Sequence, residues 1–158
     1  MSETSPTIES ILTPGLTLCC VPGSSKKKVL EQIAHYVTSE FPDLDETSLY
    51  NSLLNRERLG STGIGQGIAI PHCRLENCHK VIGVLLTLSE PIPFDAIDNE
   101  PVDLLFALIV PQEATGEHLE LLSQLAERFN EASFCNRLRA CKSQEALYQA
   151  MTGADILN

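Results

Sequence analysis

The sequence has no apolar run long enough to cross a membrane, and no positively charged, then apolar leader follows Met1. It also lacks linkers, internal repeats and low-complexity stretches. The 158 residues are therefore expected to form a single domain in the cytoplasm, without membrane insertion. We expect a flexible N-terminus over residues 1–7, the domain over residues 8–152, and a C-terminal tail over residues 153–158.

Basic residues are scarce, because 11 Lys and Arg face 21 Asp and Glu, which gives a formal net charge of −10. An acidic domain repels nucleic-acid phosphates, so no nucleic-acid partner is expected. The charge favours partners with basic surfaces instead. The single basic run, Lys26 to Lys28, is interpreted as the solvated end of a helix.

Two nucleotide-binding motifs are also missing. The glycine-punctuated stretch "GSTGIGQGIAIPH", residues 60–72, has no Gly-Lys-Ser/Thr ending and is no P-loop. Its glycine spacing differs from the dinucleotide fingerprint, and no helix follows it. The six cysteines are not read as a disulfide framework, because no secretory leader accompanies them.

The stretch "AIPHCRLENCH" holds two histidines and two cysteines, His72, Cys73, Cys78 and His79. The cysteine spacing lies within the range of structural zinc sites. However, His72 and Cys73 would point to opposite faces of a strand, and no second cysteine pair lies nearby. A redox pair is less favoured, because the C-x-x-C spacing is absent. We expect no metal and no other cofactor, and zinc binding stays an alternative.

Strands and helices alternate along the chain. A strand is expected in residues 15–21, helices in 22–41, 42–60 and 114–132, two apolar strands in 81–94 and 101–111, and two short helices in 133–153. The run "LLFALIV" indicates a strand buried on both faces, so the prediction is an α/β domain whose mixed or parallel sheet is covered by helices. Expected helix caps are Ser24 or Ser25, Asp43 or Asp45, Ser133 and Ser143. Adjacent Cys19 and Cys20 are expected on opposite faces of their strand.

Three polar side chains are expected to point inward. Arg56 lies three residues after Leu53 on the apolar stripe of its helix, and His118 begins the buried stripe of a later helix. His72 follows Pro71, which restricts the local backbone and helps to orient the imidazole. Arg56 could instead cover core or pair with a local carboxylate, and His118 could be a buried, hydrogen-bonded histidine.

A histidine, a second histidine and an arginine form a plausible set for holding a phosphoryl group on imidazole. The neutral ring of His72 would be the nucleophile, and Arg56 would stabilise the transferring oxygens with nearby amide donors. Ser61, Thr62 and Gly63, just upstream, are candidate phosphoryl-binding residues.

The segments "RERLGSTGIGQGIAIPH", "PIPFDAIDNEPVDLLFALIVP" and "EHLELLSQLAERF" resemble the enzyme IIA domains of the fructose/mannitol class of the bacterial phosphotransferase system. The resemblance covers about residues 8–152 and is strongest to the nitrogen-regulatory branch of the family. It implies a mixed sheet sandwiched by helices. It also implies phosphorylation of His72 through Nε2, with His118 as the second active-site histidine and Arg56 as the matching arginine.

The resemblance further implies a phosphoryl donor, the HPr-like carrier NPr, and regulated targets such as potassium transport or a sensor kinase. The chain would then be mainly a regulator with a phosphohistidine intermediate, rather than a stand-alone enzyme. A sugar-transport IIA component that passes phosphate to an EIIB partner, and a zinc-binding interaction domain, are the alternatives. One departure is Cys73, where relatives commonly carry glycine, and a thiol there could add sensitivity to oxidation.

Overall fold

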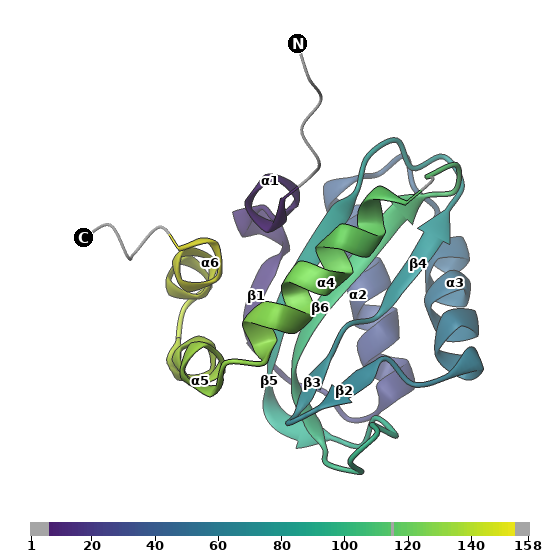
Figure 1. Cartoon of the computed structure of the whole chain (residues 1–158). Helices are drawn as coiled ribbons and strands as arrows, with labels where there is room; N and C mark the ends of the chain where they lie inside the picture. The colour runs from purple at the N-terminus through teal and green to yellow at the C-terminus, as the bar shows by residue number, and fades with distance from the viewer. Residues whose placement is uncertain (1–6, 115, 154–158) are drawn as a thin grey trace.

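The computed structural model describes residues 7–114 and 116–153. A six-stranded sheet separates two layers of helices (Figure 1). The elements in chain order are α1 (Ile8–Ile11), a 3-10 turn (Pro14–Leu16), β1 (Thr17–Val21), α2 (Lys26–Glu40), α3 (Glu46–Leu59), β2 (Gly63–Gly65), β3 (Ile68–Ala69), β4 (His72–Leu75), β5 (Ile82–Ile92), β6 (Val102–Pro111), α4 (Glu117–Phe129), α5 (Ala132–Ala140) and α6 (Gln144–Thr152).

The sheet is mixed, with strand order β1-β5-β6-β3-β2 and with β4 also paired to β6. Strand β6 runs antiparallel to β5 and parallel to both β3 and β4. It is almost wholly buried, which explains why its sequence is a continuous apolar run rather than an alternating one. The predicted α/β fold, a mixed sheet flanked by helices on both faces, is confirmed.

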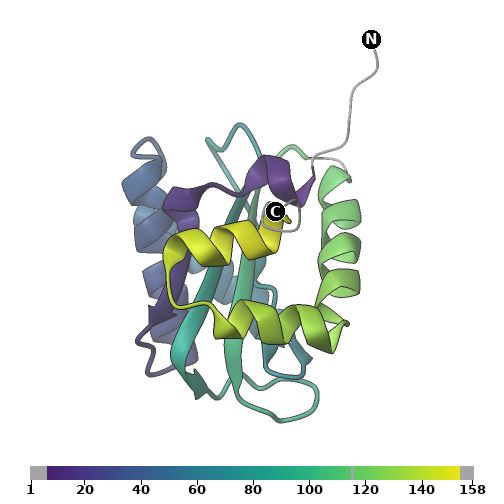
Figure 2. The same ribbon diagram turned by 90° about the vertical axis from the view of Figure 1, so that its left-hand side faces the viewer.

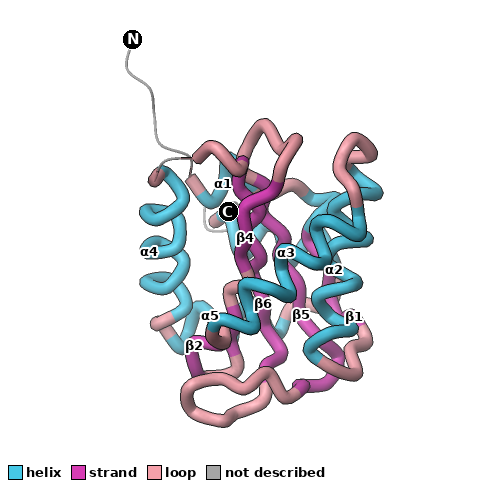
Figure 3. The backbone as a smooth tube through the Cα atoms, turned by 90° about the vertical axis from the view of Figure 1, so that its right-hand side faces the viewer, coloured by secondary structure: helices cyan, strands magenta, loops and turns pink. Residues whose placement is uncertain are grey.

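Each face of the sheet has its own apolar core. Helices α2 and α3 cover one core, and α1, α4, α5 and α6 cover the other (Figures 2 and 3). Among the described helices, none has the length and apolarity that crossing a bilayer requires. The two layers meet at the edge strand β4, which lies between α3 and α4 (Figure 3).

The helix boundaries follow local capping. The hydroxyl of Ser25 accepts a hydrogen bond from the Lys28 amide at 3.1 Å and begins α2. The carboxylate of Asp45 accepts one from the Ser48 amide at 2.8 Å and begins α3, which ends at Gly60. These caps are among those expected from the sequence.

One expected cap is wrong. Ser133 lies inside α5, which begins after the extended residue Glu131 without a side-chain cap, whereas Ser143 does cap α6. Short α1 was not foreseen; it is capped by Thr7, the single described residue of the segment expected to be flexible. Of the expected tail, Gly153 ends α6 with a left-handed φ of 82°, and residues 154–158 lie outside the described residues.

The expectation for Cys19 and Cys20 is also wrong. Their sulfur atoms lie 3.0 Å apart, although neighbouring residues of a regular strand point to opposite faces. The cause is an irregularity in β1, where the pairing with β5 shifts register between Leu18 and Val21 and Cys20 adopts a φ of 58°. A strand with such a bulge no longer alternates, so the pattern rule fails there.

Candidate active site

His72 begins strand β4, directly after an interruption in the pairing with β6. Strands β3 and β4 both run parallel to β6 in the same register, but Ile70 and Pro71 interrupt them. The Ile70 amide donates to the Thr62 carbonyl at 3.0 Å, and the Ile70 carbonyl accepts from Nδ1 of His72 at 2.7 Å. The interruption therefore frees a backbone carbonyl to hold the imidazole.

This contact sets the tautomer of the ring. A carbonyl oxygen can only accept a hydrogen bond, so Nδ1 of His72 carries the proton. In the neutral ring the lone pair is then on Nε2. His72 is half-buried, and its ring forms part of the wall of a surface cavity of about 470 Å³. The site thus presents an oriented nucleophilic nitrogen.

The same cavity brings together the three residues on which the sequence argument relied. His72 from β4, Arg56 from the last turn of α3 and His118 from the first turn of α4 all line it. Arg56 lies on α3 and His118 on α4, which cover opposite faces of the sheet. Strand β4 lies between these two helices (Figure 3). Cations and hydrogen-bonding groups thus surround the nucleophile.

Burial lowers the pKa of His72 below the usual imidazole value, because it disfavours the charged ring. The positive charges of Arg56 and of a protonated His118 lower it further, whereas the hydrogen bond to Ile70 and the charge of Glu57 oppose the shift. The balance keeps the ring neutral at pH 7, which is the form that can act as a nucleophile.

His118 carries an unusual feature, because its Nδ1 atom is buried and has no hydrogen-bond partner among the described residues. Buried polar atoms are nearly always paired, so this nitrogen is an exception among the described residues. The side chain is half-buried, which agrees with the expectation that His118 begins the inward stripe of α4.

The inward position of α3 belongs to Glu57 rather than to Arg56. Glu57 lies four residues after the buried Leu53 and is itself buried, whereas Arg56 is half-buried beside the cavity and donates from Nη1 to the Gly60 carbonyl at 2.9 Å. The interpretation of Lys26 as a solvated helix end is wrong, because its ammonium lies 3.1 Å from the carboxylate of Glu57.

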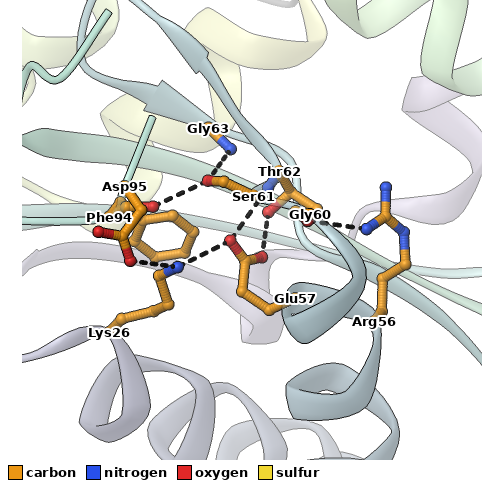
Figure 4. A network of polar contacts seen from close by, with 9 residues as sticks. All are labelled: Lys26, Arg56, Glu57, Gly60, Ser61, Thr62, Gly63, Phe94 and Asp95. Atoms are coloured by element: carbon orange, nitrogen blue, oxygen red, sulfur yellow. Dashed lines mark hydrogen bonds and ion pairs between the residues drawn. The ribbon is translucent and has the colours of Figure 1, made fainter. Parts of the chain in front are cut away.

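The polar groups of Ser61, Thr62 and Gly63 form hydrogen bonds with one another and with nearby segments (Figure 4). The Ser61 hydroxyl donates to the Phe94 carbonyl at 2.8 Å and accepts from the Gly63 amide at 3.0 Å. None of the three lines the cavity of about 470 Å³ beside His72. Their suggested role in binding a phosphoryl group stays a prediction.

Sequence reasoning missed Arg74 and Glu57. Arg74 lies two residues after His72 on the same side of β4, lines the same cavity and donates to the Gln112 carbonyl at 3.1 Å. Strand alternation could have identified Arg74, and the four-residue helix repeat from Leu53 could have identified Glu57.

Of the cysteines near His72, Cys73 lies at the base of the same cavity and packs into the core on the side of α2 and α3. Cys78 and His79 line a different hollow. Within residues 7–114 and 116–153, no group of three or more His, Cys, Asp or Glu side chains is arranged to hold a metal ion. The geometry therefore gives the zinc alternative no support.

Thiol labelling should distinguish the cysteines. Burial raises the pKa of Cys73 to about 12, so its reactive thiolate is scarce at neutral pH. Cys20, in contrast, is exposed. A maleimide at pH 7 should modify Cys20 in the folded protein and leave Cys73 unmodified, as read by peptide mass mapping. Labelling of Cys73 at the rate of Cys20 would show that the strand opens readily.

Comparisons with known proteins show the family of the chain. Residues 10–153 match the family model "Phosphoenolpyruvate-dependent sugar phosphotransferase system, EIIA 2". The chain is 55% identical over 142 residues to a nitrogen regulatory protein from Pseudomonas aeruginosa. The aligned residues cover 90% of this chain and 92% of that protein.

Solved structures place the fold in the same group. The crystal structure of nitrogen regulatory protein IIA-Ntr from Neisseria meningitidis has a TM-score of 0.86 at 39% identity, over 92% of this chain and 99% of that one. The crystal structure of IIA mannitol from Escherichia coli shares the fold, with a TM-score of 0.69 at 16% identity over 85% of this chain and 95% of that one. With its family model and its most similar relatives in agreement, the chain belongs to the EIIA type-2 family of the phosphoenolpyruvate-dependent phosphotransferase system, within its nitrogen-regulatory IIA-Ntr group.

Proposed function

We propose that the protein accepts a phosphoryl group on Nε2 of His72 and regulates other proteins through its phosphorylation state. The observation that carries this proposal is the 2.7 Å contact between Nδ1 of His72 and the Ile70 carbonyl, which leaves Nε2 as the nucleophile inside the cavity. Family membership supplies the reaction class, since the phosphotransferase system moves phosphoryl groups between its components.

The transfer balances without a net proton. The donor is a phosphohistidine on an HPr-like carrier, NPr. The lone pair on Nε2 of His72 attacks phosphorus, the N–P bond of the donor breaks, and the electron pair of that bond returns to the donor imidazole. The proton on Nδ1 of His72 stays in place, hydrogen-bonded to Ile70. No metal is needed in this step, because Arg56 supplies the positive charge.

Arg56 and His118 have distinct roles in the proposed step. The guanidinium of Arg56 stabilises the negative charge on the transferring oxygens from the α3 side of the cavity. A phosphoryl oxygen on His72 is an acceptor for the ring of His118, which lines the same cavity from the α4 side. Each helical layer therefore contributes one group that holds the phosphoryl oxygens.

Phosphorylation changes the charge of this cavity by nearly two units, which is enough to alter which surfaces bind there. A regulator of cytoplasmic targets, with potassium transport or a sensor kinase among the candidates, fits a protein whose signal is a charge at one exposed cavity. The formal charge of −10 favours a carrier with a basic rim, so association should slow as salt is added.

The test is reconstitution from purified components. The protein is incubated with phosphoenolpyruvate, enzyme I and the HPr-like carrier, and its intact mass is measured before and after brief acid treatment. The expected result is one phosphoryl adduct that acid removes and alkali preserves, because phosphohistidine is acid-labile. A protein that stays unmodified beside a competent IIA protein in the same mixture would refute phosphoryl acceptance.

A further inference from the structure

A buried carboxylate lies behind the candidate active site. The side chain of Glu57 is 3% exposed, and its Oε2 lies 3.1 Å from the ammonium of Lys26. Lys26 also lies 3.1 Å from Asp95 and 5.0 Å from the centroid of the Phe94 ring (Figure 4). A charge buried this deeply is costly unless it is paired and hydrogen-bonded, so the arrangement needs an explanation.

The remaining bonds of Glu57 go to one residue. Its Oε2 accepts from the Thr62 amide at 3.0 Å, and its Oε1 accepts from the Thr62 hydroxyl at 2.7 Å (Figure 4). Thr62 is 5% exposed, so both bonds are made away from water. The pair fixes the backbone of Thr62 in position and in direction.

Thr62 in turn holds the residue that orients the nucleophile. The Thr62 carbonyl accepts from the Ile70 amide at 3.0 Å, and the Ile70 carbonyl accepts from Nδ1 of His72 at 2.7 Å. The contacts form one continuous series from Lys26 through Glu57, Thr62 and Ile70 to the imidazole.

Arg56 depends on the same turn. Its Nη1 donates to the Gly60 carbonyl at 2.9 Å, and the Gly60 amide donates to the Glu57 carbonyl at 3.2 Å. The turn whose Gly60 carbonyl accepts the Arg56 guanidinium is thus hydrogen-bonded to the Glu57 carbonyl through Gly60 and to the Glu57 carboxylate through Thr62. Movement of Glu57 would displace both the nucleophile and the cation.

We propose that Glu57 is a positioning residue for phosphoryl transfer, which acts with Lys26 and Thr62 to set the geometry of His72 and Arg56. The inference rests on the proposed function, because it assigns a role in that reaction. Glu57 is not among the residues that line the cavity, so it acts through the residues it holds. Small displacements of reacting groups cost large factors in rate, which is why such a network matters.

The charge of Glu57 has a second effect, which a purely structural contact would not have. It raises the pKa of His72 against burial, Arg56 and His118, which lower it. Removal of this charge must therefore lower the pKa of His72 further. Removal of the Thr62 hydroxyl leaves this charge in place, so it can change the pKa of His72 only through the hydrogen bond to Ile70.

Three variants separate these effects, and a fourth is the control. Glu57→Gln removes the charge, and Thr62→Val removes the hydroxyl with little change of volume. Thr62→Ser keeps the hydroxyl and removes only the methyl group. Glu31→Gln is the matched control, because Glu31 is an exposed carboxylate paired with Lys28 at 3.3 Å on the surface of α2. Thermal unfolding identifies variants that fold.

The experiment combines an NMR titration of the imidazole nitrogens of His72 with rapid-quench phosphorylation by the carrier. We expect Glu57→Gln to lower the pKa of His72 and to slow phosphorylation about 10- to 100-fold. Thr62→Val should slow phosphorylation similarly while the charge of Glu57 stays in place, Thr62→Ser should keep the wild-type rate, and Glu31→Gln should match the wild type.

Three results would contradict the positioning role of Glu57, the proposed function or the coupling to the pKa of His72. Wild-type rates in folded Thr62→Val and Glu57→Gln would reduce the network to a stabilising contact. If Glu57→Gln does not fold, Thr62→Val and Thr62→Ser still decide the positioning role. If even the wild type accepts no phosphate, the proposed function fails, whereas the titration still reports whether Glu57→Gln changes the proton affinity and Nδ1–H signal of His72. An unchanged pKa and Nδ1–H signal would overturn the coupling independently of transfer.

Discussion

Replacement of His72 by alanine should abolish the acid-labile phosphoryl adduct. Nε2 of His72 is the oriented nucleophile in the cavity, and alanine offers no lone pair for phosphorus. His118 does not replace it in this scheme, because its role is to bind the phosphoryl oxygens. Intact-mass analysis after incubation with enzyme I and the carrier measures the effect directly, and the expected change is from one adduct to none.

The matched control for this substitution is His79→Ala. His79 is an exposed histidine seven residues along the chain that lines a different hollow. It should leave the adduct intact. An acid-labile adduct that survives His72→Ala would assign the phosphoryl group to another histidine and would refute the tautomer argument. Retained secondary structure in the circular dichroism spectrum would exclude unfolding as the cause of a loss.

Replacement of Arg56 by alanine should slow phosphoryl transfer about 100- to 1,000-fold, a typical cost for the removal of one preorganised group that stabilises transition-state charge. The guanidinium lines the cavity and is held by the Gly60 carbonyl at 2.9 Å, so it is already in place before the donor binds. The adduct should still form at long times, because the nucleophile is intact. Single-turnover kinetics with the phosphorylated carrier measure the rate.

Arg58→Ala is the control for charge alone. Arg58 lies in the same last turn of α3, carries the same charge and is exposed. If Arg58→Ala slowed transfer as much as Arg56→Ala, the effect would come from general attraction of the carrier rather than from the cavity. Repeating both measurements at high salt separates these cases, because screening weakens long-range attraction more than a contact inside the cavity.

Local patterns in the sequence predicted most of the elements. Caps such as Ser25 and Asp45 and the stripe of α2 follow from hydrogen bonds and periodicities that act within a few residues. Such patterns fail where the backbone leaves its regular form. The pair Cys19 and Cys20 meets because of a bulge, and Ile70 and Pro71 interrupt the pairing with β6 between β3 and β4.

The candidate site shows the same limit. Counting three residues from Leu53 selects Arg56 and counting four selects Glu57, so the helix repeat identifies both as candidates and does not rank them. The partners of Glu57 depend on distance in space: Lys26 lies on another helix, 31 positions earlier in the chain. No local rule pairs these residues, and the same holds for the contact of Thr62 with Ile70.

The placement of His72 at the edge where the two helical layers meet has a consequence for biogenesis. Arg56 belongs to the layer of α2 and α3, and His118 belongs to the layer of α1, α4, α5 and α6. A chain in which only one layer has packed would present the histidine without half of its surrounding groups. Under the proposed function, the rate of phosphoryl transfer to His72 would therefore report whether both helical layers have packed against the sheet.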